Sequence, residues 1–489
     1  MIRLPDVAAD AGVLFTYQNG EAAGQYSILE SLGGGVSLVD LDSDGRIDIF
    51  AAGGGQFDNA GIPHGVPSYA ARQTGMNGDL HFTDSGAASG LNQAWYYSHG
   101  AAAGDFDNDG FSDLLVTGFG GLQLFQGMGD GTYRECAGVS GLHDSGWSSS
   151  AAWADLNGDS APDLYVVHYV DWSPENNPSC LSPDGQQQDI CSPRQFNGTP
   201  DVVYLSQADS SFADWSGQCG EISSGKGLGI VAGDFDGDGD VDLYVTNDTV
   251  RNSLLINDGG QLEDLSEAHG VAYGDSGLAE GSMGVDAADY NNDGLVDLFV
   301  ANYENESFAL YRSFDGTVFQ HLSRRTGITA ACRLTVGWGT VVCDLDNDTH
   351  EDIFVSNGHV IRHPQSASVA QPPLVLMNVS GERFTDIAAQ AGDYTSGQHF
   401  GRGAAAADLD QDGDSDLVIS RVNQPLAVLR NQSPAENRSL SVRLVGTVSS
   451  RIPVGARVVA ELRSKKKLLR LQKGGTSYSS TSSPELSFG

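Results

Sequence analysis

The sequence is poor in basic residues. It has 26 Lys and Arg against 64 Asp and Glu, a formal net charge of −38. A charge of this sign and size repels polyanions, which argues against nucleic acid and anionic membranes as partners of the whole chain. It suits the binding of cations, or solubility at high salt.

Long hydrophobic runs are absent as well. No stretch of 18 apolar residues occurs, so neither a transmembrane helix nor membrane insertion is predicted. The first ten residues, MIRLPDVAAD, lack the apolar core of a signal peptide, and none is predicted in this chain.

Cysteine is scarce, with six residues in 489. An even number fits an oxidising compartment only weakly in a chain of this length. Cys180 and Cys191 bracket one polar loop and are the favoured disulfide pair. For the other four, disulfide bonds and buried free thiols both stay open: Cys136, Cys219, Cys332 and Cys343.

Charge is distributed unevenly along the chain. From Asn437 to the end there are ten Lys and Arg against two acidic residues, so this part carries +8 and the rest about −46. The shift coincides with the linker-like stretch 431–437 and predicts two domains, 1–431 and 437–489.

Seven acidic nine-residue stretches repeat through the larger domain. Their spacing is 65, 50, 79, 55, 55 and 64 residues. We number them loops 1 to 7; they begin at Asp40, Asp105, Asp155, Asp234, Asp289, Asp344 and Asp408. Internal repetition of this kind predicts a repeat architecture.

The loops share a pattern of oxygen ligands. Positions 1, 5 and 9 are Asp in all seven, and position 3 is Asp or, in two copies, Asn157 and Asn291. Position 6 is Gly except at Ser160 and Thr349, and position 7 has no common side-chain chemistry, so only its backbone carbonyl can serve. Alternating oxygen ligands around a turn-forming Gly are typical of a Ca²⁺ loop.

An EF-hand does not fit these loops. That motif needs a bidentate Glu at position 12 and flanking helices. Position 12 here is Ala51, Ile419 or Val, within strand-forming runs such as LYV, and the residues before each loop are poor helix formers. Each loop is therefore predicted to join two strands as a hairpin, with position 9 as the fifth ligand.

The predicted sites number up to seven, each with side chains at positions 1, 3, 5 and 9 and the carbonyl at position 7. The residues are Asp40, Asp42, Asp44, Arg46 and Asp48; Asp105, Asp107, Asp109, Phe111 and Asp113; Asp155, Asn157, Asp159, Ala161 and Asp163; Asp234, Asp236, Asp238, Asp240 and Asp242; Asp289, Asn291, Asp293, Leu295 and Asp297; Asp344, Asp346, Asp348, His350 and Asp352; Asp408, Asp410, Asp412, Asp414 and Asp416.

A further strand-like segment recurs along the chain together with the loops. A segment resembling FTD-x5-G lies about twenty residues upstream of each later loop, and one more copy, 4–12, stands at the N-terminus. The number and spacing of these segments predict an all-β fold, a seven-bladed β-propeller of four-stranded blades plus a small C-terminal β domain. In this propeller, segment 4–12 completes the blade near 403–431. A linear solenoid ranks below it, because 4–12 would then stay unpaired.

These residues resemble a known family. The loops, for example GDFDGDGDVDLYV, are similar to the FG-GAP/VCBS repeats of integrin α-subunit propellers, and WGTVVCDLDND…FVSNGHV looks like the cartilage acidic protein 1 family. The stretch from Asn437 resembles the ASPIC/UnbV domain, whose match stops at LSFG, earlier than in family members, so a truncated C-terminus is expected. The resemblance implies a secreted or cell-surface propeller that binds Ca²⁺ and partners, with a paired-cysteine loop in the insert 164–210.

Other candidate sites are weaker. His359 and His363 stand four apart in a strand-to-loop context without an HExxH pattern, which favours a surface loop. The basic run 463–470 is interpreted as a solvated hairpin tip, with anions, glycans or the acidic propeller as alternative partners.

Two classes of function stay open. The first is a non-catalytic binding or adhesion protein outside the cytosol (extracellular, cell-surface or periplasmic) whose face loops hold a protein or glycan. The second is a propeller-fold enzyme, a polysaccharide lyase or hydrolase, with a central cleft built from residues such as Trp95, Tyr96, Tyr97, His99, Trp338 and Arg402. Fold alone does not decide between them.

Overall fold

The fold is all-β, as predicted. The computed structural model describes residues 2–76, 78–433 and 437–489, to which every structural statement below refers. Among these residues, no helix is long and apolar enough to cross a membrane. The predicted linker 431–437 falls partly on residues 434–436, which lie outside the described residues.

Antiparallel sheets follow one another along the chain. Six of them have four strands in chain order. They are β2 (Val36–Val39), β3 (Asp48–Ala51), β6 (Tyr69–Gln73) and β7 (Phe82–Asp84); β8 (Tyr97–Gly104), β9 (Asp113–Phe119), β10 (Gln123–Gly127) and β11 (Tyr133–Glu135); β12 (Ser148–Ala154), β13 (Asp163–His168), β16 (Val202–Ser206) and β17 (Phe212–Asp214); β18 (Gly227–Gly233), β19 (Asp242–Asn247), β20 (Ser253–Asp258) and β21 (Gln261–Asp264); β22 (Val285–Ala288), β23 (Asp297–Val300), β24 (Ala309–Ser313) and β25 (Phe319–His321); β26 (Gly337–Cys343), β27 (Asp352–Asn357), β28 (Leu374–Val379) and β29 (Arg383–Asp386).

A further sheet has three strands: β30 (Gly401–Ala407), β31 (Asp416–Arg421) and β32 (Gln424–Leu429). The N-terminal segment runs beside β32, where the N–H of Val7 donates to the carbonyl of Val428 (2.8 Å). Several outer strands lead into short helices: α1 (Gly86–Ser89), α2 (Ser266–His269), α3 (Ser323–Thr326), α4 (Ile328–Cys332), α5 (Ala388–Ala391) and α6 (Asp393–Ser396).

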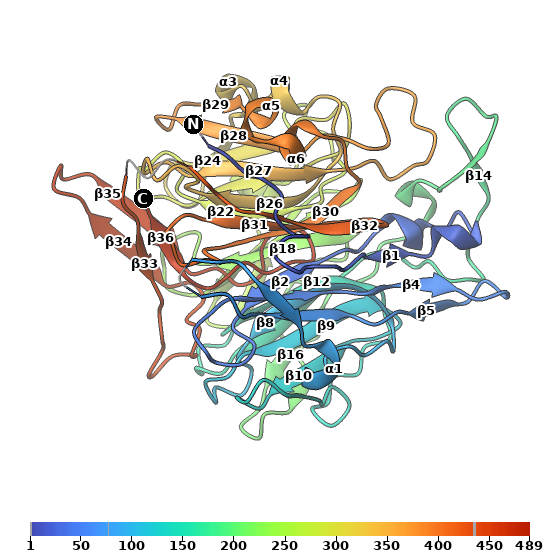
Figure 1. Cartoon of the computed structure of the whole chain (residues 1–489), viewed down its shortest axis with the longest axis horizontal. Helices are drawn as coiled ribbons and strands as arrows, with labels where there is room; N and C mark the ends of the chain where they lie inside the picture. The colour runs from blue at the N-terminus through green and yellow to red at the C-terminus, as the bar shows by residue number, and fades with distance from the viewer. Residues whose placement is uncertain (1, 77, 434–436) are drawn as a thin grey trace.

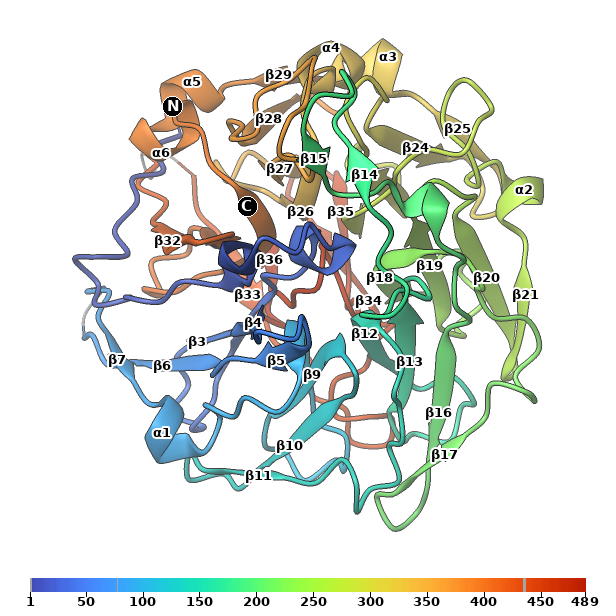
Figure 2. The same ribbon diagram turned by 90° about the vertical axis from the view of Figure 1, so that its right-hand side faces the viewer.

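The sheets are arranged around a common centre (Figure 2), which makes the fold β-propeller-like. Apolar side chains fill the space between neighbouring sheets. One buried cluster joins the first sheet to the second through Phe50 and Leu114. Another joins the first sheet to the three-stranded one through Val36 and Val418, although these lie near opposite ends of the chain.

The remaining strands extend from the two ends of these sheets (Figure 1). The C-terminal strands lie on one side: β33 (Leu440–Val442) pairs with β36 (Leu486–Phe488), and β34 (Arg457–Glu461) with β35 (Lys467–Leu471). The other side carries β1 (Gln18–Asn19), β4 (Gly54–Phe57), β5 (Pro63–Gly65), β14 (Cys180–Leu181) and β15 (Gln188–Asp189), with the 3-10 helices η1 (Glu21–Ala23), η2 (Ile28–Ser31) and η3 (Pro193–Gln195).

The insert that follows β13 is closed by an internal disulfide and held by a contact with a distant loop. The predicted disulfide between Cys180 and Cys191 is confirmed. The carboxylate of Asp189 accepts the backbone N–H groups of Arg362 (2.8 Å) and His363 (3.0 Å). The stretch 357–364, NGHVIRHP, which contains His359 and His363, therefore anchors the insert. Cys136, Cys219, Cys332 and Cys343 are free thiols.

Candidate metal-binding loops

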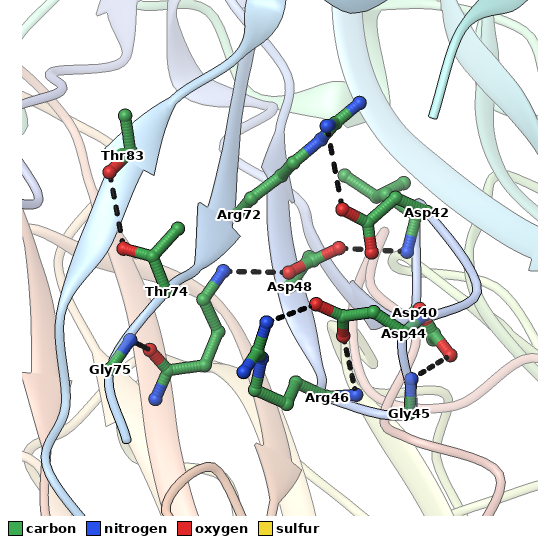
Figure 3. Close-up of polar contacts among 12 residues, drawn as sticks. Asp40, Asp42, Asp44, Gly45, Arg46, Asp48, Arg72, Thr74, Gly75 and Thr83 are labelled. Atoms are coloured by element: carbon green, nitrogen blue, oxygen red, sulfur yellow. Dashed lines mark hydrogen bonds and ion pairs between the residues drawn. The ribbon is translucent and has the colours of Figure 1, made fainter. Parts of the chain in front are cut away.

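Each acidic loop connects the first and second strands of its sheet as a hairpin. The second strand begins at the position 9 aspartate in all seven sheets, for example β3 at Asp48 and β19 at Asp242. Figure 3 shows loop 1 with Asp40, Asp42, Asp44 and Asp48 converging on one region. The position 9 aspartate is buried in all seven sheets.

The position 9 aspartate joins three parts of its sheet. In loop 1, one Asp48 oxygen accepts the N–H of Leu41 (2.8 Å) and the other accepts the N–H of Gln73 on the third strand (2.7 Å). The equivalent bond recurs in all seven sheets at 2.7 to 2.9 Å, and in the last sheet its donor is Asn431, just after the third strand. Sequence reasoning treated position 9 only as a ligand and missed this bracing role, although its invariance at the head of a strand was a readable signal.

Positions 1 and 5 shape the turn itself. In every loop the position 5 carboxylate accepts the N–H of position 7, as Asp238 does from Asp240 (2.9 Å). In six loops the position 1 carboxylate accepts the N–H of position 6, as Asp408 does from Gly413 (3.0 Å). The predicted role of the position 7 carbonyl stays a prediction.

The backbone takes a left-handed conformation twice in each loop. Position 6 has a positive φ in all seven, from 76° at Ser160 to 100° at Gly239, so the two non-glycine copies adopt the same turn under strain. Position 4 also has a positive φ in all seven, for example 56° at Asn108. The abundance of Asn and Gly at position 4 was the overlooked sequence signal.

Carboxylate oxygens gather closely in five loops. Ligand atoms of positions 1, 3 and 9 lie within 4.8 Å of one another in loops 1, 2, 4 and 7, and those of positions 1, 3 and 5 do so in loop 6. Loops 3 and 5 carry Asn157 and Asn291 at position 3. Two carboxylates about 5 Å apart repel by about 3 kcal/mol at an effective dielectric near 20, so a cation would relieve the cluster.

Burial and mutual repulsion disfavour the charged forms of these groups. Burial, with a smaller contribution from neighbouring carboxylates, raises the pKa of Asp48 to about 7 and that of Asp242 to about 8. In five loops, at least one buried carboxylate oxygen has no hydrogen-bond partner: Asp42 Oδ1, Asp105 Oδ1, Asp297 Oδ2, Asp346 Oδ1 and both oxygens of Asp410. Unpartnered buried oxygens on hard ligands fit a divalent cation such as Ca²⁺.

The third strand adds a side chain that distinguishes the loops. This side chain belongs to the residue immediately before the one whose backbone N–H donates to the position 9 aspartate. An arginine there contacts the carboxylates of loops 1, 5 and 7: Arg72 lies 3.4 Å from Asp42, Arg312 lies 2.9 Å from Asp293, and Arg430 pairs with Asp410. The equivalent residue is Gln126 in loop 2 and an apolar residue in the others: Leu205, Ile256 and Met377. Sequence reasoning missed this position.

The basic C-terminal stretch contacts the acidic loops. Lys466 Nζ donates to the Thr349 hydroxyl in loop 6 (2.7 Å), and Arg457 donates to the carbonyl of Gly294 in loop 5 (2.9 Å). Lys465, in contrast, is exposed and pairs with Glu461 within its own hairpin. Of the alternatives for this stretch, the acidic propeller itself is a partner of Lys466.

Most of the side chains nominated for a central catalytic cleft are buried. Tyr97, His99, Trp338 and Arg402 are at most 3 % exposed, whereas Trp95 is 56 % exposed. The Arg402 guanidinium lies over the Trp338 ring and donates to backbone carbonyls, including that of Gly358 (3.2 Å). These groups therefore pack the centre of the fold.

The fold and the loops together define a β-propeller-like repeat protein with acidic hairpins. A model of the FG-GAP-like repeat matches residues 40–116, 105–166, 234–300 and 289–355. The chain belongs to the FG-GAP-like repeat family. It is similar to cartilage acidic protein 1 from Mus musculus, with 24 % identity over 93 % of this chain and 68 % of that protein. The Homo sapiens protein is 25 % identical over 93 % of this chain and 66 % of its own length, so the chain spans about two thirds of these relatives.

Among solved structures, the fold is similar to the BP39L lectin from Burkholderia pseudomallei. The TM-score is 0.50 at 12 % identity, and the match covers 83 % of this chain and 97 % of the lectin. At this identity the likeness concerns the fold alone.

Proposed function

We propose that this protein is a calcium-stabilised, seven-bladed β-propeller that acts outside the cytosol, extracellularly, at the cell surface or in the periplasm, as a non-catalytic binding or adhesion protein. The observation that carries the proposal is the internal geometry of the acidic loops, which repeats around the molecule and leaves buried carboxylate oxygens without partners.

The blade count of seven rests on the sheets. Six sheets have four strands, and β30–β32 with the N-terminal segment beside them form the seventh. The apolar contact between the first and last sheets supports closure of the ring.

Calcium at these loops has a structural role in this proposal. The loops have no bidentate Glu at position 12, so affinity in the range of extracellular modules, about 10⁻⁴ to 10⁻³ M, is expected. A site with a Kd of about 0.1 mM in 1 mM Ca²⁺ stabilises the fold by about 1.4 kcal/mol, and several sites together contribute several kcal/mol. Such affinity suits a compartment with millimolar Ca²⁺, and the disulfide suits the same location.

Thermal unfolding with and without the ion tests the calcium part. The melting temperature is measured in 1 mM Ca²⁺, in excess EDTA, and in EDTA with Mg²⁺ added. We expect EDTA to lower the melting temperature by more than 10 °C and Mg²⁺ to restore little of it. An unchanged melting temperature in EDTA would refute the structural role.

The partner is proposed to be a protein or a glycan held by loops at the end of the sheets that carries the insert, because the C-terminal strands cover part of the acidic end. Glycan and protein arrays probed with and without Ca²⁺ test this part. A hit that disappears when the disulfide-bonded loop 180–191 is deleted would place the partner at the insert.

A further inference from the structure

The chain has a C-terminal segment that lies among the innermost strands of the sheets. We call residues 474–483, GGTSYSSTSS, the axial segment. Its backbone bonds to five of these strands. Ala232 of β18 donates to Gly474 (2.7 Å), Ser477 donates to Val285 of β22 (2.6 Å), and Ala101 of β8 donates to Ser479 (3.2 Å). Thr481 donates to Val36 of β2 (2.9 Å), and Ser483 donates to Ala406 of β30 (3.1 Å).

Side chains complete the contacts with the two remaining sheets. The Ser150 hydroxyl of β12 accepts the N–H of Ser479 (3.0 Å), and the Ser477 hydroxyl accepts the N–H of Thr340 of β26 (3.0 Å). Ten residues of one segment thus contact the innermost strand of each of the seven sheets that carry an acidic loop.

The innermost strands leave room for the segment in a regular way. Five residues before each loop stands a small residue: Gly35, Gly100, Ser150, Gly229, Gly284, Gly339 and Gly403. A Cβ added at Gly100 would lie 2.3 Å from the Ser479 carbonyl oxygen, and its three nearest atoms all belong to Ser479. A Cβ at Gly403 would lie 2.4 Å from the Ser480 hydroxyl. The ring of small residues therefore matches a Gly/Ser/Thr-rich strand.

The axial segment is held at its middle by the side chain of Tyr478, and near its first residue by the side chains of Lys473 and Arg470. The fully buried Tyr478 hydroxyl accepts the N–H of Gly33 (2.9 Å), and its ring centroid lies 4.7 Å from that of Trp338. Just before the segment, Lys473 pairs with Asp286, and Arg470 lies 3.3 Å from Glu351.

The entrance beside these ion pairs is loosely packed. A cavity of about 190 Å³ is lined there by Glu351, Arg470, Lys473 and Thr476, among others. Glu351 Oε2, Arg470 Nη2 and Thr476 Oγ1 have no hydrogen-bond partner. Strand pairing within the seven sheets does not involve the axial segment. Withdrawal of the segment from this end would therefore break its own contacts and leave the pairing within these sheets intact.

We propose that the centre of the propeller is a peptide-binding site for an extended, small-residue strand with one tyrosine, and that in this chain the axial segment occupies it as a releasable intramolecular ligand. While the segment is bound, the site is closed to any other peptide. This proposal does not depend on calcium or on the partner proposed above.

The test uses the full chain cut at one place. A specific protease site is inserted between Val448, which is 86 % exposed, and Ser449. After cleavage, at a fixed 1 mM Ca²⁺, release of the fragment from residue 449 onward is followed by its exchange against a fluorescent synthetic peptide of residues 466–489. Circular dichroism shows whether the sheets stay folded.

Two variants and one control sharpen the result. Gly100→Ala adds a methyl group whose three nearest atoms all belong to Ser479, and Gly138→Ala is the control because a Cβ there meets no atom within 4 Å. Tyr478→Phe leaves the Gly33 N–H without its acceptor. We expect exchange with the sheets folded, at least tenfold faster in Gly100→Ala than in Gly138→Ala, and several-fold faster in Tyr478→Phe.

The proposal fails if the fragment leaves only when the sheets unfold, since the segment would then be a permanent part of the core. It also fails if Gly100→Ala exchanges no faster than the control. Should Gly100→Ala not fold, an unchanged exchange rate in Tyr478→Phe overturns the proposal by itself.

Discussion

The sheets have two opposite ends (Figure 1), and a different kind of contact holds each of them. At the acidic end, one short hairpin repeats seven times, and its carboxylates bond mainly to backbone N–H groups within their own sheet. At the opposite end, single side-chain contacts hold non-repeating loops: Asp189 to Arg362 and His363, and Asp144 to His168. The repeating end is encoded locally and concentrates negative charge, whereas the other end depends on contacts that occur once.

The largest loss of stability is expected when a position 9 aspartate, which braces three parts of its sheet, is removed. Asp242→Ala removes the acceptor of two buried backbone N–H groups, those of Phe235 and Asn257. Each unsatisfied group costs about 1–3 kcal/mol, so a loss of about 2–6 kcal/mol in the free energy of unfolding is expected in urea titrations with Ca²⁺ present. Asp240→Ala in the same loop is the control. Equal losses in the two variants would show that position 9 is no brace.

The arginine near loop 7 should compete with a bound cation. Arg430→Met leaves the buried Asp410 carboxylate without its ion pair. We expect the metal-free protein to lose about 1–3 kcal/mol, because a buried charge is left unpaired. The calcium concentration that gives half of the rise in melting temperature should fall. Arg438→Met, at an exposed position, serves as the control. A rise in the required calcium would contradict the idea of competition.

The opposite end should respond to pH through one ion pair. His168 is buried, with Nε2 2.9 Å from Asp144 and Nδ1 2.7 Å from the Pro200 carbonyl. Burial alone would lower the pKa of His168, but Asp144, Asp201 and this carbonyl outweigh burial and raise it. Asp201 accepts the backbone N–H of His168, and burial raises the pKa of this aspartate to about 7.

Because the folded pKa of His168 lies above its unfolded value, the pair stabilises the fold below the unfolded pKa and loses this contribution as pH rises through the folded pKa. His168→Gln should therefore cost about 1–3 kcal/mol near pH 6 and much less near pH 9, measured by chemical denaturation at both pH values. A cost that does not change with pH would mean that the imidazole is neutral in the folded protein.

The smallest effect is expected from strain within an acidic loop. Ser160 occupies the left-handed position 6 that five other loops give to Gly. Ser160→Gly should raise the free energy of unfolding by about 0.5–1 kcal/mol, because the steric cost of a left-handed side chain exceeds the entropic cost of Gly. Ser415→Gly, at position 8 of loop 7, should instead lower it. Destabilisation in both would show that Ser160 is not strained.

Much of the acidic end, and the disulfide at the opposite end, could be predicted from the sequence. The Asp and Gly spacing within nine residues, followed by Val, predicted hairpins that join strands, and the polar loop between Cys180 and Cys191 predicted the disulfide. The bracing bonds of Asp48, the arginines near loops 1, 5 and 7 and the axial segment were missed, because each needs a partner from another strand or from the far end of the chain.

The sequence by itself determined the repeating unit: the order of ligands, the turn at position 6 and the small residue five positions before each loop. Each of these features depends on residues that are close together in the sequence, so the spacing of those residues is enough to specify it. Only the tertiary structure decided that the small residues form a ring and that Tyr478 lies buried among the innermost strands beside Gly33 and Trp338. The contact between Tyr478 and Gly33 joins residues more than four hundred positions apart, and it exists because the sheets meet around one centre narrow enough for a single strand.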